Sequence, residues 1–429
     1  MPNALPRYGW YGDDFTGATD TLSVLADNGQ RALLFLRIPT PAQLTKAGSL
    51  DALGIAGATR AMPPEAMSAE LDLAGRFFAG LGIDILHYKC CSTFDSAPHL
   101  GSIGAAVRAL RRHFPNPLVP ILGGQPNLGR YCLFGTLFAA AGTGGTVHRI
   151  DRHPTMSVHP ATPMGEADLR RHLAAQGLGD VGLVDYRRYG GPGASELGES
   201  LAGTAGPLLF DVARIGDLAV IGRLIAERAV GAPMLVVGPS SVAQALAGTP
   251  LLAGGAGDAM VAAALARPSG PVLALVGSLS PVTRAQVEAA SGYARIAVDP
   301  LRLLGEAGHA AVLRQEACRL LGEGDVMLVT DRPAGAPGDT AKVAAATGEL
   351  LRAIVAEAAI ARLVVAGGDT STLAVRALDI WGLSHRAPLV PGAPLCRAHS
   401  DQPRLDGIDV VLKGGQMGPP DFFALVAGR

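Results

Sequence analysis

The sequence has few of the features that mark secreted, membrane-spanning or nucleic-acid-binding proteins. Its 429 residues include five cysteines, and these form no CxxC pair and no disulfide-like spacing, which favours a reducing compartment. We find neither an apolar run long enough to cross a bilayer nor the pattern of a signal peptide. The formal net charge is −1, so no overall field attracts nucleic acid or an acidic membrane. We therefore expect a cytoplasmic protein without nucleic-acid or membrane partners.

Two familiar site motifs are also missing. The pattern GxxxxGK[ST] does not occur, which excludes a P-loop enzyme. The histidines His148, His153, His159 and His172 fit neither HExxH nor zinc-finger spacing. No protein-bound metal site is predicted.

What the sequence does contain indicates a well-packed two-domain α/β protein. Hydrophobic residues make up 48% and charged residues 17%, and the length exceeds that of one ordinary core. Short β-rich runs alternate with Ala/Leu-rich helical stretches, which predicts mostly parallel sheets flanked by helices. The Gly-, Ala- and Pro-rich residues 247–270 are the predicted linker between domains 1–246 and 271–429. We expect the active site in the cleft between these domains.

Several strands and two helices can be placed. Strands are expected at 7–12, 31–38, 84–89, 117–122, 181–186, 207–212 and 233–238, and then at 272–280, 294–299, 325–330 and 362–368. One helix should end at Asn28-Gly29, and another should begin with Thr162 as N-cap before Pro163. Ligands of parallel α/β sheets bind beyond the carboxyl ends of the strands, so strand-to-helix junctions are the candidate sites.

The first junction, "WYGDDFTGATD", carries adjacent carboxylates at Asp13 and Asp14. One interpretation is that one aspartate caps the next helix while the other is solvated. The other is that they bind substrate hydroxyls, a Mg²⁺ ion or a reacting proton, while N–H groups at Thr16-Gly17 offset their charge.

The second junction, "HYKCCSTFDSAP", places Lys89 at the end of an apolar strand. A buried lysine needs a partner, which would be Asp13, Asp14 or an anionic substrate, or else a purely structural ion pair. Ser92 and Asp95 are candidate substrate ligands. Because neighbours on a strand point to opposite faces, Cys90 and Cys91 are not expected to chelate a metal together, and both are expected to be core thiols.

Two Pro/Gly-rich loops, "GGQPNLGRYCLFGTLF" and "HRIDRHPTMSVHPATPM", supply further candidate substrate ligands. These are Asn127, Arg130 and His159. Arginine suits a bidentate grip on a carboxylate.

Three glycine-rich junctions of the second half suggest phosphate binding: "LVGSLS", "VVAGGDTSTLAVRAL" and "VLKGGQMGPPDFF". Glycines allow close backbone approach, and N–H groups at a helix start form an anion site. The candidate residues are Ser278, Ser280, Gly367, Gly368, Asp369, Thr370, Ser371, Lys413, Gly414 and Gly415. Each turn alone is common, but three of them in one domain favour a nucleotide.

Over nearly its whole length the chain resembles the four-carbon acid sugar kinase family. The matching stretches are "GDDFTGATD", Lys89–Pro98, Gly129-Arg130, His159–Met164, Gly277–Gln286, "GGDTS" and "LKGGQMGPPDFF". The resemblance implies an ATP- and Mg²⁺-dependent kinase of threonate, erythronate and their keto relatives. It also implies that Lys89 or Arg130 holds the sugar carboxylate and that Asp13 or Asp14 accepts the proton of the attacking hydroxyl.

The departures from the family pattern concern both halves. Asp369 replaces the usual Glu, Gly414 the usual Ser, and Gln416-Met417 the usual Asn-Phe, which leaves the nucleotide contacts open. The atypical loop "GGQPNLGRYCLFGTLF" indicates a substrate unlike plain threonate and is similar to the branch that acts on 3-oxo-isoapionate.

Two alternatives and one open point remain from the sequence. "GGAGDAM" contains a GAGD segment, so a ribokinase-like sugar kinase would use Asp258 as its base. A non-catalytic sensor of acid sugar and nucleotide is the other alternative. Whether the chain forms a homodimer stays open.

Overall fold

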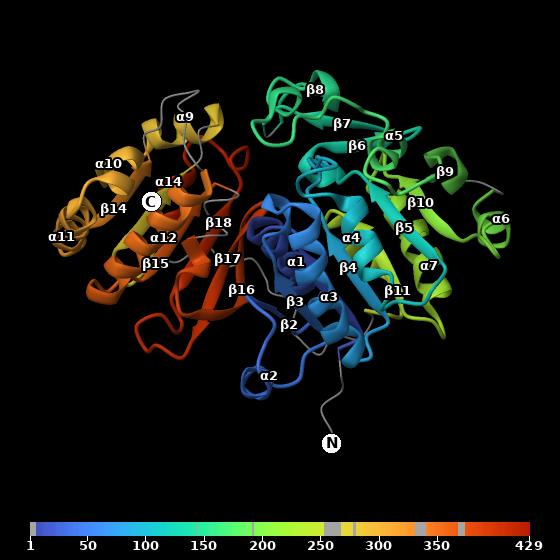
Figure 1. The fold of residues 1–429 in the computed structure, drawn as a ribbon, viewed down its shortest axis with the longest axis horizontal. Helices are drawn as coiled ribbons and strands as arrows, with labels where there is room; N and C mark the ends of the chain where they lie inside the picture. The colour runs from blue at the N-terminus through green and yellow to red at the C-terminus, as the bar shows by residue number, and fades with distance from the viewer. Residues whose placement is uncertain are drawn as a thin grey trace. The chain divides into compact units, whose positions relative to one another are not determined.

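The computed structural model describes residues 6–142, 144–190, 193–252, 267–277, 280–330, 340–367 and 374–429. The chain divides into two compact units, Met1–Ala259 and Met260–Arg429. In each unit helices flank a largely parallel sheet, which confirms the predicted fold class (Figure 1). Six residues named above lie outside the described residues: Asp258, Ser278, Gly368, Asp369, Thr370 and Ser371.

The first unit is built on a parallel sheet. In sheet order its strands are β2 (Ala32–Phe35), β3 (Ala52–Ala56), β1 (Tyr8–Gly12), β4 (Ile85–Lys89), β11 (Met234–Gly238), β5 (Leu118–Gly123), β10 (Gly206–Asp211) and β9 (Gly182–Val184). Gly12 lies in register with Ala56 on one side and with Lys89 on the other. The segments that follow β1, β3 and β4 therefore leave the sheet side by side.

Helices cover both faces of this sheet. They are α1 (Phe15–Asp27), α2 (Pro41–Ala47), α3 (Pro64–Gly80), α4 (Ile103–Leu110), α5 (Leu169–Ala174), α6 (Gly193–Ser200), α7 (Asp217–Ala229) and α8 (Ser241–Leu246). Helix α3 packs on α4, whereas α8 packs on α1 and α7. Crossovers between parallel strands are right-handed, so the direction in which the chain crosses the sheet decides the face on which its helix lies. The crossovers β1–α1–β2 and β3–α3–β4 run in opposite directions, and α1 and α3 therefore lie on opposite faces.

Helix α1 ends as predicted, and α5 does not begin as predicted. The C-cap of α1 is Asn28, and Gly29 follows with φ 75°. Helix α5 starts at Leu169, where Asp168 is the N-cap and accepts a hydrogen bond from the Arg170 N–H. The predicted start at Thr162 is therefore wrong. The Thr162 N–H and hydroxyl lie against His159 Nδ1 instead, so this threonine caps a turn in the preceding loop.

A small antiparallel sheet, which the sequence did not predict, is inserted after β5. It consists of β6 (Arg130–Leu133), β7 (Thr136–Ala140) and β8 (Val147–Arg149). Five 3₁₀ turns complete the described part of the unit: η1 (Thr59–Ala61), η2 (Pro126–Leu128), η3 (Ile150–Arg152), η4 (Met156–Val158) and η5 (Tyr186–Tyr189).

The second unit combines parallel and antiparallel strands. In sheet order these are β13 (Tyr293–Val298), β14 (Asp325–Thr330), β12 (Val272–Val276), β15 (Arg362–Ala366), β18 (Asp409–Lys413), β17 (Ala393–Ser400) and β16 (Ile380–Val390). The pairs from β13 to β18 are parallel, but β17 pairs antiparallel with both β18 and β16. The described helices are α9 (Pro281–Ala289), α10 (Pro300–Gly305), α11 (His309–Leu321), α12 (Thr340–Glu357) and α14 (Phe422–Val426).

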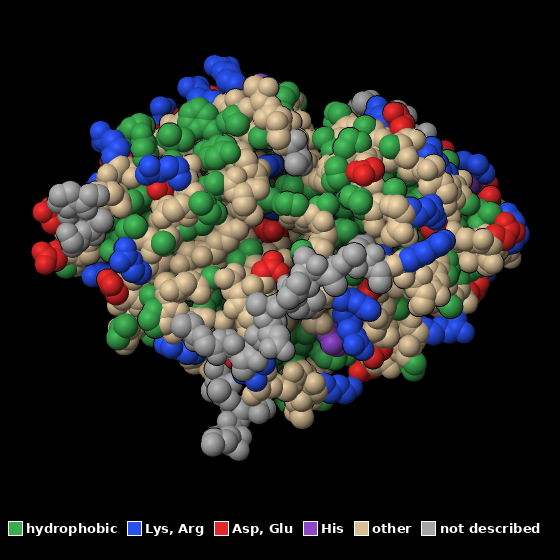
Figure 2. Space-filling view, turned by 180° about the vertical axis from the view of Figure 1, so that it is seen from behind, with side chains coloured by type: hydrophobic (Ala, Val, Ile, Leu, Met, Phe, Trp, Pro, Cys, Tyr) green, Lys and Arg blue, Asp and Glu red, His purple; other side chains and the backbone are tan. Residues whose placement is uncertain are grey.

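The surface agrees with the near-zero net charge. On the face shown in Figure 2, basic and acidic side chains are scattered among each other and among polar and apolar ones. Within the described ranges, no helix combines the length and hydropathy that a bilayer span requires.

Candidate active site

The chain order of the first unit locates its site at the ends of β1 and β4. The connection after β1 leads toward β2, and the connection after β4 leads the opposite way, toward β5. Such a switch point opens a crevice at the carboxyl ends of the two strands, where ligands of open α/β sheets bind. The backbone ties the ends together, since the Asp13 N–H donates to Lys89 O at 2.9 Å and the Gly57 N–H to Gly12 O at 2.8 Å.

The two adjacent aspartates have different surroundings, although both are buried. Asp14 is the N-cap of α1: one carboxylate oxygen accepts from the Gly17 N–H at 2.8 Å and the other from Thr16 Oγ1 at 2.6 Å. Burial, reinforced by Asp14, raises the pKa of Asp13 to about 6, although Arg60 and Lys89 act in the opposite direction. Asp13 is thus an acid that titrates close to neutral pH.

Arg60, which the sequence did not single out, is the ion-pair partner of both aspartates. Its Nη2 lies 2.9 Å from Asp13 Oδ1, and its Nη1 lies 2.9 Å from Asp14 Oδ2. The residue belongs to η1, directly after β3. Because β3 was not predicted as a strand, nothing in the sequence marked Arg60 as a residue at a strand end.

Lys89 is buried at the end of β4 and donates to the carbonyl of Cys90 at 2.8 Å. A Cβ atom on Gly17 would lie 2.6 Å from Lys89 Nζ and 2.7 Å from Asp14 Oδ1. The ammonium and the Asp14 carboxylate therefore occupy the space that glycine leaves open at the start of α1.

The loop after β4 is held in an unusual conformation. Phe94 is fully buried and has φ 54°, a left-handed conformation that is costly for a residue other than glycine. Its carbonyl accepts from Ser96 Oγ at 2.9 Å and lies 3.1 Å from His172 Nε2. Gln176 donates to Ser96 Oγ at 2.8 Å and so completes this support.

The polar residues of this loop bind one another, and Asp95 among them interacts electrostatically with Arg60 and Arg130. Thr93 Oγ1 donates to Asp95 at 2.5 Å and lies 2.9 Å from the sulfur of Cys91. Burial alone would raise the pKa of Asp95, but Arg60 and these hydrogen bonds hold it below its usual value. Cys90 is a core thiol as predicted, whereas Cys91 is only partly buried and belongs to this loop. Ser92 is buried in the same loop.

Arg130 is buried on β6, and its Nε has no hydrogen-bond partner among the described residues. Its Nη1 donates to the carbonyl of Leu128. Gln125 is also buried: its amide nitrogen donates to Asp20 at 3.0 Å, and its Oε1 is likewise unpartnered within the described ranges. Arg130 interacts electrostatically with Cys91, Asp95 and Asp20. A buried donor and a buried acceptor without partners leave room for a polar ligand.

Two further predicted ligands lie on the loops around Arg130. His159 is partly buried and interacts electrostatically with Asp95. Asn127 is exposed on η2, which is followed by Gly129 and Arg130. The structure thus groups Asp95 with Arg60, Arg130 and His159, and it places Asn127 at the solvent side.

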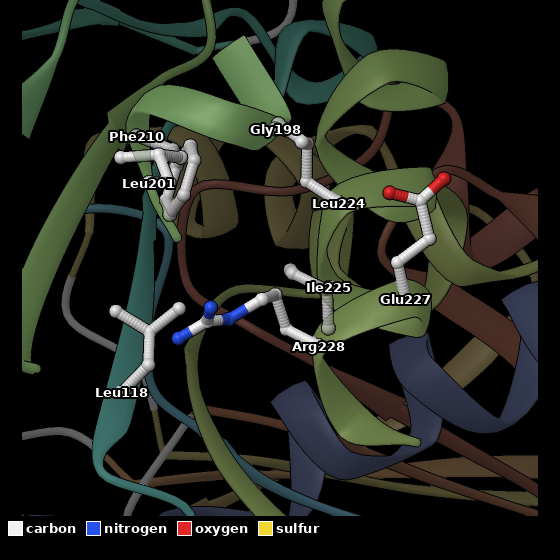
Figure 3. Close-up of a pocket in the computed structure, with 8 residues that line it drawn as sticks. All are labelled: Leu118, Gly198, Leu201, Phe210, Leu224, Ile225, Glu227 and Arg228. Atoms are coloured by element: carbon white, nitrogen blue, oxygen red, sulfur yellow. The ribbon is translucent and has the colours of Figure 1, made fainter. Parts of the chain in front are cut away.

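Two cavities lie apart from all these residues. The cavity in Figure 3, of about 80 Å³, lies between β5, β10, α6 and α7 and is lined mainly by apolar side chains such as Leu118, Leu201 and Phe210. Another, of about 510 Å³, is lined by residues of β13, α10 and α11 and of the turn between these helices. Neither contains a predicted site residue. The lining of the first also includes Glu227 and Arg228 of α7.

In the second unit the corresponding switch point lies between β12 and β15. After β12 the chain continues to β13 on one side of the sheet, and after β15 it continues to β16 on the other. The Gly277 N–H donates to Ala366 O at 2.9 Å, and the Gly367 N–H donates to Lys413 O at 2.8 Å. These bonds bring the three glycine-rich junctions together at the carboxyl ends of neighbouring strands.

The loop after β18 is fixed by its own lysine and by one face of α9. The buried ammonium of Lys413 donates to Thr283 Oγ1 at 2.9 Å and to the carbonyls of Gly414 and Met417. Burial lowers the pKa of Lys413 to about 7. Its contacts bind the loop itself, which the prediction of a phosphate ligand did not anticipate.

Helix α9 supplies the rest of this support. Ser280 caps the helix by accepting from the Thr283 N–H, and both hydroxyls donate to the carbonyl of Gly415. The amide of Gln286 donates to the carbonyls of Met417, Gly418 and Pro419 at 2.9–3.0 Å. A Cβ at Gly414 would meet only Met417 Cγ at 3.6 Å, so crowding does not explain the replacement of the usual serine there.

Comparison with known proteins matches the two halves to two domain families. Residues 8–246 match the family described as "Sugar-binding N-terminal domain", and residues 273–423 match "Nucleotide-binding C-terminal domain". Fold and site therefore define a two-domain protein that pairs a sugar-binding half with a nucleotide-binding half.

The chain belongs to the four-carbon acid sugar kinase family, and it is a phosphotransferase that acts on a hydroxyl group of a small acid sugar. A 3-oxo-isoapionate kinase from Paraburkholderia graminis is 39% identical, with 97% of this chain and 93% of that protein covered. A 3-oxo-tetronate kinase from Cupriavidus necator is 31% identical, with 97% and 96% covered. A solved Haemophilus influenzae structure of family DUF1537 superposes with a TM-score of 0.70 at 26% identity and covers 98% of this chain and 99% of its own.

Proposed function

We propose that the chain uses ATP to phosphorylate a branched or oxidised sugar acid such as 3-oxo-isoapionate. The higher identity to a 3-oxo-isoapionate kinase (39%) than to a 3-oxo-tetronate kinase (31%) supports this substrate class. The atypical loop that carries Gln125 and Arg130 supports it too. The observation that carries the proposal is the pair of buried, unpartnered groups on these two side chains, because they would be satisfied by a carboxylate and a hydroxyl of one ligand.

Asp13 is the proposed proton acceptor. The oxygens of Asp14 are committed to the start of α1 and to Arg60, whereas Asp13 accepts hydrogen bonds from Arg60 alone among the described residues. A base that titrates near pH 6 is ionised at neutral pH and still basic enough to accept a proton. Asp14 then fixes the geometry of the site.

The sugar acid is bound by the remaining residues of the first unit. Arg130 or Lys89 pairs with its carboxylate, since both are buried cations at the strand ends. Hydroxyl and oxo groups are the partners proposed for Ser92, Asp95, Asn127 and His159.

ATP is the second substrate, and its phosphates are assigned to the second unit. The N–H groups of Gly277 and Gly367 hold these turns and the loop at Gly414 and Gly415 together at the carboxyl ends of neighbouring strands, where ligands of α/β sheets bind, and this supports the assignment. The sequence adds Ser278, Gly368, Asp369, Thr370 and Ser371. Ser280 and Lys413 hold the loop after β18 in place by donating hydrogen bonds to its carbonyls.

The residues that the structure describes do not form a protein cage for Mg²⁺. Among the described residues, no group of three His, Cys, Asp or Glu side chains could hold a metal ion, and Arg60 occupies the two aspartates. A Mg²⁺ ion would therefore arrive with the phosphates of ATP.

The domain boundaries follow the same division. We assign substrate binding to residues 1–246, nucleotide binding to residues 271–429, and the role of a linker to 247–270. The extents of the two family matches, residues 8–246 and 273–423, support these limits.

The substrate is tested by an ADP-release assay over a panel of tetronates, 3-oxo-tetronates and branched oxo-pentonates. We expect the highest kcat/KM for a branched oxo acid. A preference for plain threonate would contradict the proposed substrate class. ATP binding without ADP release on any sugar acid would favour the sensor alternative.

The assignment of the base is tested by Asp13→Asn. The substitution removes the proton acceptor but keeps the shape of the side chain, so kcat should fall by roughly 10²–10⁴. Asp14→Asn, the matched variant, keeps a capping oxygen but loses the charge that pairs with Arg60, so it should lower the melting temperature and lower kcat less. Nearly full turnover of Asp13→Asn would rule out Asp13 as the base.

A further inference from the structure

Arg60 stands out among the residues that neither the sequence motifs nor the family names assign to the reaction. Its side chain is 16% exposed, and its guanidinium contacts both buried carboxylates. The Arg60 N–H also donates to the carbonyl of Asp13 at 3.1 Å, so backbone and side chain of one residue both hold Asp13. Next to it, Thr59 lies 3.2 Å from the hydroxyl of Tyr88 on β4, which fixes the turn to the sheet.

The contacts of Arg60 on Asp13 are directional. Nη2 binds Oδ1 at 2.9 Å and Nε binds Oδ2 at 3.3 Å, which is the bidentate fork that sets the plane of a carboxylate. Although its own burial acts in the opposite direction, the two aspartates keep the pKa of Arg60 above its ordinary value. The guanidinium therefore carries its charge at any pH at which the enzyme is folded.

We propose that Arg60 is a positioning residue for phosphoryl transfer, which orients the Asp13 carboxylate and keeps it ionised so that it can accept the proton of the attacking hydroxyl. This inference rests on the proposed function, in which Asp13 is the base. In that step the substrate O–H proton passes to Asp13 while the substrate oxygen bonds to the terminal phosphorus. The bond from that phosphorus to the bridging oxygen breaks and ADP leaves with its electrons. Asp13 later returns the proton to solvent.

The charges around Asp13 determine what the loss of Arg60 does. Asp14 on its own segment opposes ionisation, and Arg60 from η1 and Lys89 from β4 favour it. The buried Tyr88 of β4 and Cys90, which follows β4, interact with it while neutral. Without Arg60, Lys89 alone balances two carboxylates in a buried site. The pKa of Asp13 then rises further above 6, and a larger fraction of Asp13 is protonated at pH 7.

The experiment measures the pH dependence of kcat/KM in the wild type, Arg60→Lys and Arg60→Met. The wild-type rate should rise with pH through about 6. In Arg60→Met this rise should move up by about one to two pH units, with activity at pH 7 about twofold lower for a shift of one unit and about tenfold lower for a shift of two, and largely recovered near pH 9. Arg60→Lys keeps the charge and loses the fork, so its rise should move less.

Matched measurements separate this effect from unfolding. Arg76→Met removes an exposed arginine that pairs with Asp72 on α3 and should leave the profile unchanged. Melting temperatures show whether each variant is folded, and Arg60→Lys serves if Arg60→Met is not. A rise that stays at the wild-type pH in a folded Arg60 variant, whatever its rate, overturns the inference.

Failure of the inference can be told from failure of the proposed function. If Asp13→Asn is inactive and the rise does not move in the Arg60 variants, Asp13 remains the base and Arg60 has no part in its ionisation. If Asp13→Asn keeps its turnover, the base has been assigned wrongly and both fail.

Discussion

At the scale of single residues, the start of α1 shows how a buried acidic pair is tolerated. Asp14 is held by two donors of the helix start, and Arg60 contacts both carboxylates. The ammonium of Lys89 lies close to Gly17, where a side chain would collide with it. Four charges of mixed sign thus share one buried site, because each has a partner of opposite sign or a hydrogen bond.

Gly17→Ala tests this crowding. The added Cβ would lie 2.6 Å from Lys89 Nζ and 2.7 Å from Asp14 Oδ1, and both atoms are ends of side chains that can move. We expect kcat to fall by about tenfold or more while the melting temperature stays unchanged or rises, since alanine favours helix over glycine by about 1 kcal/mol.

The control is Gly80→Ala at the end of α3, where a Cβ would meet no atom within 4 Å. It should leave kcat unchanged. If Gly17→Ala keeps wild-type kcat, the positions of Lys89 and Asp14 do not matter to the reaction.

At the scale of secondary structure, the sequence predicted most elements around the site of the first unit but not β3. The strand reads Ala-Leu-Gly-Ile-Ala, and its glycine is required because a Cβ at Gly54 would lie 2.1 Å from the ring of Trp10 on β1. A small-residue strand that packs against a large neighbour has no β-branched or alternating pattern to recognise. Arg60 was missed for the same reason, whereas Lys89 follows an evident strand and was found.

The other errors also have local causes. Thr162 and Pro163 form a good helix start in sequence, but His159 engages the threonine and the chain turns instead. The hairpin of β6 and β7 has Phe134 with φ 52° before Gly135, so its turn does not show one of the usual residue pairs. Both cases depend on local contacts that secondary-structure propensities of single residues do not take into account.

Helix α9 offers a test at this scale. Gln286→Met should leave the carbonyl of Gly418 without its side-chain donor, at a cost of about 1–3 kcal/mol if it finds no other partner, while the carbonyls of Met417 and Pro419 keep the bonds from Lys413 and from the Phe422 N–H. Since the loop then loses its fixed shape, we expect the KM for ATP to rise about tenfold while the KM for the sugar acid stays constant.

Arg284→Met provides the comparison, because Arg284 is exposed on the same helix. It should leave both KM values and the melting temperature unchanged. An unaltered KM for ATP in folded Gln286→Met would show that the loop after β18 does not contact the nucleotide.

At the scale of the whole molecule, two units with separate matches predict separable functions. Composition and alternating patterns were sufficient for the fold class, because they reflect burial and connectivity that both units share. They could not supply the antiparallel β16 and β17 of the second unit, since β17 depends on pairing with β18, and β16 on pairing with β17.

The independence of sugar-acid binding and ATP binding is tested with Arg130→Met and Gln286→Met, singly and together. Arg130→Met should raise the KM for the sugar acid by about tenfold or more through the loss of a charged hydrogen bond, and it should leave the KM for ATP unchanged. In the double variant the two free-energy changes should add to within about 0.5 kcal/mol. A larger interaction energy would mean that the two binding functions are coupled.

The turn at Phe94 has a consequence for how this enzyme can change. Glycine at this position would relax the backbone but leave a void of the size of the ring, and a β-branched residue would partly fill the void at a higher torsional cost. Either substitution of Phe94 therefore replaces the backbone strain with a packing defect or increases the strain. Diversification of the substrate range is expected to proceed through the exposed loop residues around Asn127, while this buried ring stays in place.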